Sequence, residues 1–198
     1  MKQITFNQYR KIDLFILCIL TVIFEVIATL ATNKWFFLQA MSISITLTMT
    51  CITMFRWGKY ALVPSFLGAL VYCILTGGTM AQFIAYCGGS LFCVAALPLL
   101  LKFGLKETRL DFVKRTIFVV VTYISIVLGR WLLSLLFDFS FSSLIVFLTT
   151  DILSLLFAVI VVSIAKNVDG LIEDQKSYLI RLDEESKKEQ QANLNDPF

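Results

Sequence analysis

The sequence contains no histidine, the side chain that most often serves as a general acid–base group or a metal ligand. It also contains no Walker A motif, no Gly-x-Ser-x-Gly, no His-Glu-x-x-His and no aspartate-rich magnesium motif. These absences leave little apparatus for acid–base, nucleophilic or metal-assisted catalysis. We therefore predict that the chain is not an enzyme and holds no metal and no cofactor. Any ATP hydrolysis linked to it must happen on another polypeptide.

Charged residues are scarce as well. Only 16% of the 198 residues are charged, whereas 58% are hydrophobic, and the mean hydropathy is +0.83. A chain this apolar does not stay soluble, so we expect the lipid bilayer to be its solvent. The net charge of +3 is too small to favour nucleic acid as a partner. The cysteines lie inside apolar stretches without zinc or redox spacing, which predicts packed free thiols at Cys18, Cys51, Cys73, Cys87 and Cys93.

The apolar residues form six runs of about 17–24 residues, a length with which an α-helix crosses a bilayer. These runs comprise residues 14–32, 36–55, 60–76, 80–101, 116–137 and 142–165. We therefore predict an all-α, polytopic integral membrane protein with six transmembrane helices. A cytoplasmic N-terminal segment, residues 1–13, precedes this domain of residues 14–165. Residues 166–198 follow it as a cytoplasmic amphipathic helix and a tail that we expect to be disordered from about Ser186.

Basic residues indicate the orientation, because Lys and Arg are concentrated in the cytoplasmic loops of membrane proteins. All but two of the 17 Lys and Arg residues lie at the N-terminus, between runs two and three, between runs four and five, or after run six. The opposite side has only Lys34, with the acidic Asp138 and an uncharged Gly77–Gly78 turn. We therefore predict a multi-pass protein of the cell membrane with both termini in the cytoplasm.

Three charged residues fall inside the apolar runs, where an unpaired charge costs several kcal/mol. Glu25, Arg130 and Asp151 each lie about seven to nine residues from the predicted outer end of their helix. We therefore expect them at one depth, although their helices do not all run in the same direction. A solute-binding pocket explains this agreement, and so does a buried ion-pair network that fixes helix packing. The sequence leaves both explanations open.

Polar residues around these charges favour a pocket. Hydroxyls repeat at helical spacing around Glu25, and Gln82 and Tyr86 share a face of the fourth run. Residues 42–50 carry a hydroxyl at every second position, and wound as a helix, as we predict, they suit the interior of the bundle. Trp35 at the outer junction is an interfacial anchor or, on a second interpretation, a lid. The candidate substrate-binding residues are Glu25, Trp35, Gln82, Tyr86, Arg130 and Asp151, with the planar guanidinium of the arginine offered to a carboxylate, phosphate or carbonyl group of the solute.

Residues 55–78, FRWGKYALVPSFLGALVYCILTGG, are similar to the second-loop and third-helix region of some S components of energy-coupling factor (ECF) transporters. Six short spans within 198 residues, cytoplasmic termini and polar groups in the outer half also resemble these membrane-embedded subunits. The resemblance implies that the chain binds a water-soluble vitamin or related micronutrient from outside. It further implies docking onto an EcfT-like T component that carries two ECF ATPase subunits, and toppling in the membrane to release the substrate inward.

The chain departs from this family at the Ala-x-x-x-Ala patch through which many S components contact the T component. Its nearest match is Ala28 and Ala31, three residues apart, so Gly68 and Ala69 are alternative contacts. No vitamin-specific motif is present, and the substrate identity stays open. Two other functions remain. One is a non-transport membrane scaffold subunit like the MreD-type proteins of cell-shape complexes, with its intramembrane charges paired internally. The other, which has the least support, is a membrane enzyme acting on lipids.

Cysteine-accessibility labelling tests the predicted orientation. With Lys34→Cys, Lys106→Cys and Lys188→Cys in intact cells, only position 34 is expected to react with a membrane-impermeant reagent. The other two should react once the membrane is opened, because the basic segments that contain them are predicted to be cytoplasmic. The parent chain is the control. A reversed pattern would overturn both the orientation and the outer position of the three intramembrane charges.

Overall fold

The structure, a computed structural model, describes residues 5–35, 42–137 and 142–195, without the side chains of Trp35 and residues 189–195. Every regular element within these residues is helical. In chain order the elements are α1 (Phe6–Trp35), α2 (Thr46–Trp57), η1 (Gly58–Ala61), α3 (Leu62–Leu75), α4 (Met80–Phe83), η2 (Ile84–Gly88, a π-helix), η3 (Leu91–Ala96), α5 (Leu97–Phe103), α6 (Leu105–Leu110), α7 (Phe112–Ser134), η4 (Leu135–Phe137), α8 (Ser143–Thr150), α9 (Ile152–Ala165) and α10 (Gln175–Asn195).

Four helical runs in the described residues are long and apolar enough to cross a membrane: Phe6–Lys34, Thr46–Leu75, Met80–Phe103 and Phe112–Phe137. The pair α8 and α9, bent by 40°, is a fifth if it forms one span. These runs are those of an all-α membrane protein, as the composition predicts. The number of six spans stays a prediction, because the single helical run Thr46–Leu75 overlaps both the second and the third predicted span.

The run Thr46–Leu75 reverses its direction near Gly58, whose φ is +57°. Gly68 of α3 lies so close to Thr46, the first residue of α2, that an added Cβ would be 2.1 Å from the threonine Oγ1. Along one straight helix these two residues would be about 33 Å apart. The helices α2 and α3 therefore lie side by side and run in opposite directions.

The helix α2 occupies the centre of the bundle. Each of its residues is buried, and it contacts α1, α3, α7 and α9. Its Phe55 packs edge to face against Phe118 of α7, with ring centroids 5.1 Å apart. The hydroxyl of Thr53 donates to the Met49 carbonyl of the same helix at 2.7 Å. The hydroxyl-rich segment is thus confirmed as an interior element, since no side of α2 faces lipid.

The start of α2 is later than the sequence predicts. The predicted second span begins at residue 36, but residues 42–45 are not helical and α2 begins at Thr46. Residues 36–41 lie outside the described part of the chain. The backbone N–H of Ser42 donates to the Thr150 carbonyl at 2.9 Å, and that of Ser44 to the Ser154 hydroxyl at 2.8 Å. Because the N–H groups of Ser42 and Ser44 have tertiary partners, residues 42–45 can be non-helical inside the bundle without exposing unpaired backbone groups to lipid.

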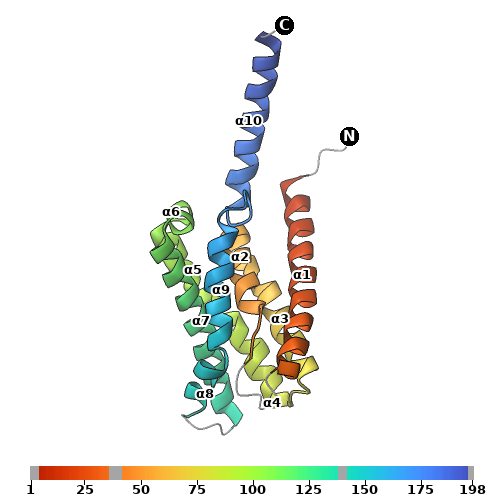
Figure 1. Cartoon of the computed structure of the whole chain (residues 1–198), viewed down its shortest axis with the longest axis vertical. Coiled ribbons are helices and arrows are strands. Elements are labelled where there is room, and N and C mark those ends of the chain that lie inside the picture. The colour runs from red at the N-terminus through yellow and green to blue at the C-terminus, as the bar shows by residue number, and fades with distance from the viewer. Residues whose placement is uncertain (1–4, 36–41, 138–141, 196–198) are drawn as a thin grey trace.

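Both termini lie at one end of the bundle, where α1 starts and from which α10 extends (Figure 1). Arg56, near the end of α2, connects the elements at this end. Its Nη2 lies 2.6 Å from Oδ1 of Asp13 in α1, and its Nη1 donates to the Gly170 carbonyl at 2.7 Å. The Asp13 carboxylate also accepts from the Arg56 Nε at 3.0 Å, so the pair is bidentate.

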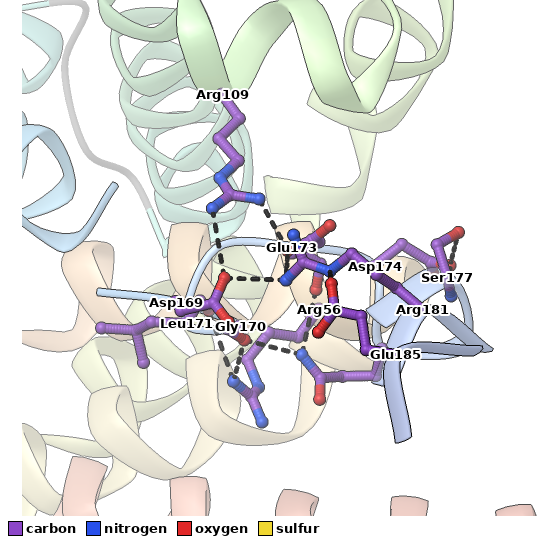
Figure 2. A network of polar contacts seen from close by, with 11 residues as sticks. Arg56, Arg109, Asp169, Gly170, Leu171, Glu173, Asp174, Ser177, Arg181 and Glu185 are labelled. Atoms are coloured by element: carbon purple, nitrogen blue, oxygen red, sulfur yellow. Dashed lines mark hydrogen bonds and ion pairs between the residues drawn. The ribbon is translucent and has the colours of Figure 1, made fainter. Parts of the chain in front are cut away.

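Further ion pairs hold the residues between α9 and α10 against the bundle. Figure 2 shows Arg109, at the end of α6, with its Nη1 2.6 Å from Oε2 of Glu173. Arg181 of α10 contacts Asp169 at 2.8 Å and Glu173 at 3.3 Å. The carboxylates of the connecting segment are therefore shared between α6 and α10.

The helix α10 continues to Asn195, whereas the sequence predicts disorder from about Ser186. This segment is rich in Glu, Gln and Lys, which have high intrinsic helix propensity. An i,i+4 ion pair between Lys187 and Asp183, with the Lys187 Nζ 2.6 Å from the Asp183 Oδ2, further stabilises the helix. The helix extends along the long axis of the bundle and beyond its end (Figure 1).

Candidate functional site

Glu25 of α1 caps the N-terminus of α2. Its side chain is completely buried, and its Oε2 accepts from the backbone N–H groups of Ile45 (2.8 Å) and Thr46 (3.0 Å). The hydroxyls of Ser44 (3.0 Å) and Thr46 (2.9 Å) donate to the same oxygen. The first N–H groups of a helix have no partner within it, and a bilayer interior has no water to replace one. A carboxylate at this position also interacts favourably with the helix dipole. Glu25 therefore allows α2 to begin inside the bundle.

Arg130 of α7 and Asp151 form a buried ion pair through Nη1 and Oδ2. Asp151 lies at the bend between α8 and α9, and its Oδ1 accepts from the Ser42 hydroxyl at 2.6 Å. The guanidinium carbon of Arg130 is 4.5 Å from the centroid of the Tyr86 ring, close enough for a cation–π interaction. Gly89 provides the space for the arginine, because an added Cβ there would be 2.5 Å from the Arg130 Cγ. The pair thus connects α7, the α8–α9 bend, η2 and the non-helical residues before α2.

A polar cavity of about 210 Å³ lies at the end of the bundle opposite the termini. Its wall comes from α1, from the non-helical residues before α2, from α3 and α4, from η2 and from the end of α8. The lining residues are Thr29, Thr32, Asn33, Ser42, Ile43, Tyr72, Cys73, Thr76, Gln82, Tyr86 and Thr150. None of them is charged, and all but two carry a hydroxyl or an amide. Such a space suits a small solute that forms hydrogen bonds.

Aromatic rings form one part of this wall. Tyr72 of α3 and Tyr86 of η2 are stacked, with ring centroids 5.3 Å apart and an interplanar angle of 30°. Phe147 of α8 meets Tyr86 edge to face at 5.8 Å. Offset stacking and edge-to-face contact are the two favourable arrangements of aromatic pairs. The orientation of Tyr86 is therefore fixed by Tyr72, Phe147 and Arg130 together.

The three intramembrane charges do not line the cavity. Glu25 bonds to the start of α2, and Arg130, which the sequence assigns to a solute, bonds to Asp151. The ion pair borders only a much smaller space of about 20 Å³. Internal pairing was the second of the two explanations that the sequence left open, and the structure shows it for Arg130 and Asp151.

Gln82 and Tyr86 do line the cavity, while Trp35 is the last residue of α1 and its side chain lies outside the described part of the structure. Sequence reasoning missed Tyr72 as a site residue, because a single tyrosine in an apolar helix gives no pattern. It placed Thr29 on the polar face of the first run without assigning it to the site. The repeat of hydroxyl residues at helical spacing around Glu25 is the sequence signal that could have assigned Thr29 to the site.

Glu25→Ala is expected to destabilise the protein by about 2–6 kcal/mol, because two buried backbone N–H groups lose their acceptor at roughly 1–3 kcal/mol each. Thr21→Ala, one turn earlier on the same buried face, is the matched control. The Thr21 hydroxyl bonds to the Leu17 carbonyl of its own helix at 2.7 Å, and its loss should cost about 1 kcal/mol. Denaturant unfolding in detergent micelles compares the two variants. Equal losses would contradict the capping role.

Substitutions of Arg130 and Asp151 are expected to have strongly non-additive effects on the free energy of unfolding. Arg130→Met or Asp151→Asn alone should cost about 3–5 kcal/mol, since each change leaves a buried charge without its partner. The double variant should cost much less than the two single losses combined. The measurement is a double-mutant cycle on unfolding free energies. Additive losses would show that the ion pair does not contribute as a unit.

The described residues contain no group of three or more Cys, Asp or Glu side chains that could hold a metal ion. What the site offers to a ligand is hydrogen bonding and aromatic contact. Comparison of the chain with protein-family models, with curated proteins and with solved structures finds no match. The function is therefore inferred from the cavity and from the buried charges around it.

Proposed function

We propose that the chain is the substrate-binding membrane subunit of an ECF-type transporter. It captures a water-soluble micronutrient from outside, and a T component with two ATPase subunits drives the uptake. The observation that carries this proposal is the polar cavity of about 210 Å³ within a bundle whose outward faces are apolar. Larger spaces of about 390 and 520 Å³ lie elsewhere, but charged residues around α6 and α10 line the first and mainly apolar residues of α1 and α3 line the second. The uncharged polar lining between apolar helices distinguishes the cavity from both.

The arrangement of the helices supports uptake from the outer side. If both termini are cytoplasmic, as the basic residues predict, the cavity at the opposite end faces outward (Figure 1). In this proposal α2 and α3, which run in opposite directions on either side of Gly58, count as two separate crossings. With α8 and α9 as one bent span, the chain then crosses the membrane six times.

In this proposal Gln82 and Tyr86 contact the solute directly. For Trp35, the last residue of α1, the sequence-based interpretations as an interfacial anchor or as a lid stay predictions. Glu25 and the Arg130–Asp151 pair are positioning residues that hold the wall in place. The chain has no nucleotide-binding motif, so ATP hydrolysis takes place on the partner subunits.

A non-transport membrane scaffold of the MreD type is the second candidate. The pairing of Arg130 with Asp151 favours it, and so does the use of Glu25 as a helix cap. With this ion pair in place, Arg130 and Asp151 balance each other's charge without a ligand. The two candidates differ in their explanation of the cavity, which a scaffold does not use.

A cavity-filling variant tests the proposal. Thr76 lines the cavity at the end of α3, and Thr76→Phe is expected to abolish co-purification of a small molecule, detected by native mass spectrometry. ATP-dependent uptake of that molecule into vesicles containing the T component and both ATPases should be lost with it. Ile74→Phe is the matched control, because Ile74 is 61% exposed on the outer surface of the same helix. This variant should retain binding and uptake.

The same vesicles without the partner subunits should show binding and no accumulation. ATP-driven accumulation by the single chain would contradict the assignment. Equal behaviour of the Thr76 and Ile74 variants would show that the cavity is not the binding site. Stable association with other membrane proteins, without any bound small molecule, is the result expected of a scaffold.

A further inference from the structure

We infer that the cavity takes a solute with no net charge, built on one flat ring that carries hydrogen-bonding groups. This inference rests on the proposed function, because it specifies the substrate class of the same cavity. It departs from the sequence-based expectation that Arg130 binds an anionic group of the solute.

The charge distribution supports an uncharged solute. The described residues that line the cavity carry no charge. Asp151, which follows Thr150 of the wall, is bonded to Arg130 and to the Ser42 hydroxyl. The Arg130 guanidinium is in turn placed between this carboxylate and the Tyr86 ring. Glu25, one turn before Thr29 of the wall, accepts with its Oε2 from the N–H groups at the start of α2. A charged solute would find no charge of opposite sign in the cavity lining, and burying an unpaired charge is strongly unfavourable.

The aromatic wall supports a flat ring. The Tyr86 ring already contacts Tyr72, Phe147 and Arg130. Tyr72 is only half-buried and has one ring contact, the stack with Tyr86. We therefore place the solute ring against Tyr72, where it extends the existing stack.

An unpartnered hydroxyl marks the polar contact. Thr29 is 2% exposed and lines the cavity, yet its hydroxyl has no hydrogen-bond partner among the described residues. Other threonines of this helix bond to their own backbone, as Thr32 does to the Ala28 carbonyl at 2.8 Å. Thr48, Thr50 and Thr116 also have buried hydroxyls without a partner in the described part of the chain, but of these four threonines only Thr29 lines the cavity. Because buried polar groups are nearly always bonded, we assign the solute as the partner of the Thr29 hydroxyl. Gln82 adds a second contact, because its Oε1 accepts from the Thr79 N–H at 2.8 Å and leaves its amide N–H groups for the solute.

The volume limits the size of the solute. The cavity has a volume of about 210 Å³. This space holds one ring with small substituents. It is too small for a drug-sized molecule, for which pockets of about 300–1,000 Å³ are typical.

Three probes of one shape separate the possible charges: benzamide is neutral, benzoate is anionic and benzylamine is cationic. Their affinities are measured by ligand-observed NMR on the full chain in lipid nanodiscs. Benzamide is expected to bind at least tenfold more tightly than either charged probe. Thr76→Phe should abolish its binding and Ile74→Phe should leave it unchanged.

Thr29→Val tests the hydroxyl contact, with Thr21→Val as the matched control on the same face of α1. Valine keeps the shape of threonine and removes its hydroxyl. Thr29→Val is expected to weaken benzamide about fivefold, the loss of one hydrogen bond. The melting temperature without ligand should be unchanged or higher, because an unpartnered buried hydroxyl is removed. Thr21→Val should leave the benzamide affinity unchanged.

The outcomes distinguish the two proposals. Tighter binding of benzoate or benzylamine, abolished by Thr76→Phe, would overturn the neutral ligand class and leave the binding function intact. Absence of binding by all three probes would overturn the ligand class, and retention of a co-purified molecule by the wild type alone would still support the function. A Thr29→Val variant that melts at a lower temperature but binds benzamide normally would show that this hydroxyl is structural.

Discussion

The contact between Glu25 and the start of α2 determines how the rest of the bundle is arranged. A helix that begins inside a membrane protein presents several N–H groups with no intrahelical acceptor, and lipid provides none. One carboxylate oxygen from α1 accepts from two of these N–H groups and from two hydroxyls. Residues 42–45 can therefore remain non-helical while α2, the fully buried central helix, keeps its position.

The Arg130–Asp151 pair has the complementary effect on the other side of the same segment. Asp151 marks the bend between α8 and α9, and it binds the Ser42 hydroxyl with the oxygen that is not used by Arg130. A buried ion pair contributes little net stability, because desolvation offsets much of its attraction. Its contribution here is geometric, since it fixes the α8–α9 bend, Ser42 and the Tyr86 ring relative to one another.

The sequence predicts the class of the protein, the interior position of α2 and the gathering of Glu25, Arg130 and Asp151 at one end. These features depend on composition, on helical periodicity and on the cost of charge in lipid, which are local properties of the chain. The non-helical residues 42–45 were not predictable, because their acceptors are side chains and carbonyls of α1, α8 and α9. The pairing of Arg130 was open for the same reason, since depth alone does not identify its partner. Tyr72 joins the cavity only because α3 folds back beside α2.

Two irregular places in the bundle, residues 42–45 and the α8–α9 bend, also contribute to the cavity wall. Ser42 and Ile43 precede α2, Thr150 precedes the α8–α9 bend, and all three line the cavity. Before α2, the backbone N–H groups of Ser44 and Ile45 donate to the side chains of Ser154 and Glu25. The Ser42 hydroxyl donates to the Asp151 carboxylate at the bend, which connects the two places. The side chains of Glu25, Arg130 and Asp151 thus position the segments that form the polar wall, while the lining residues themselves are uncharged. In the proposed function such a cavity selects solutes by hydrogen bonding and ring contact, because its lining carries no charge.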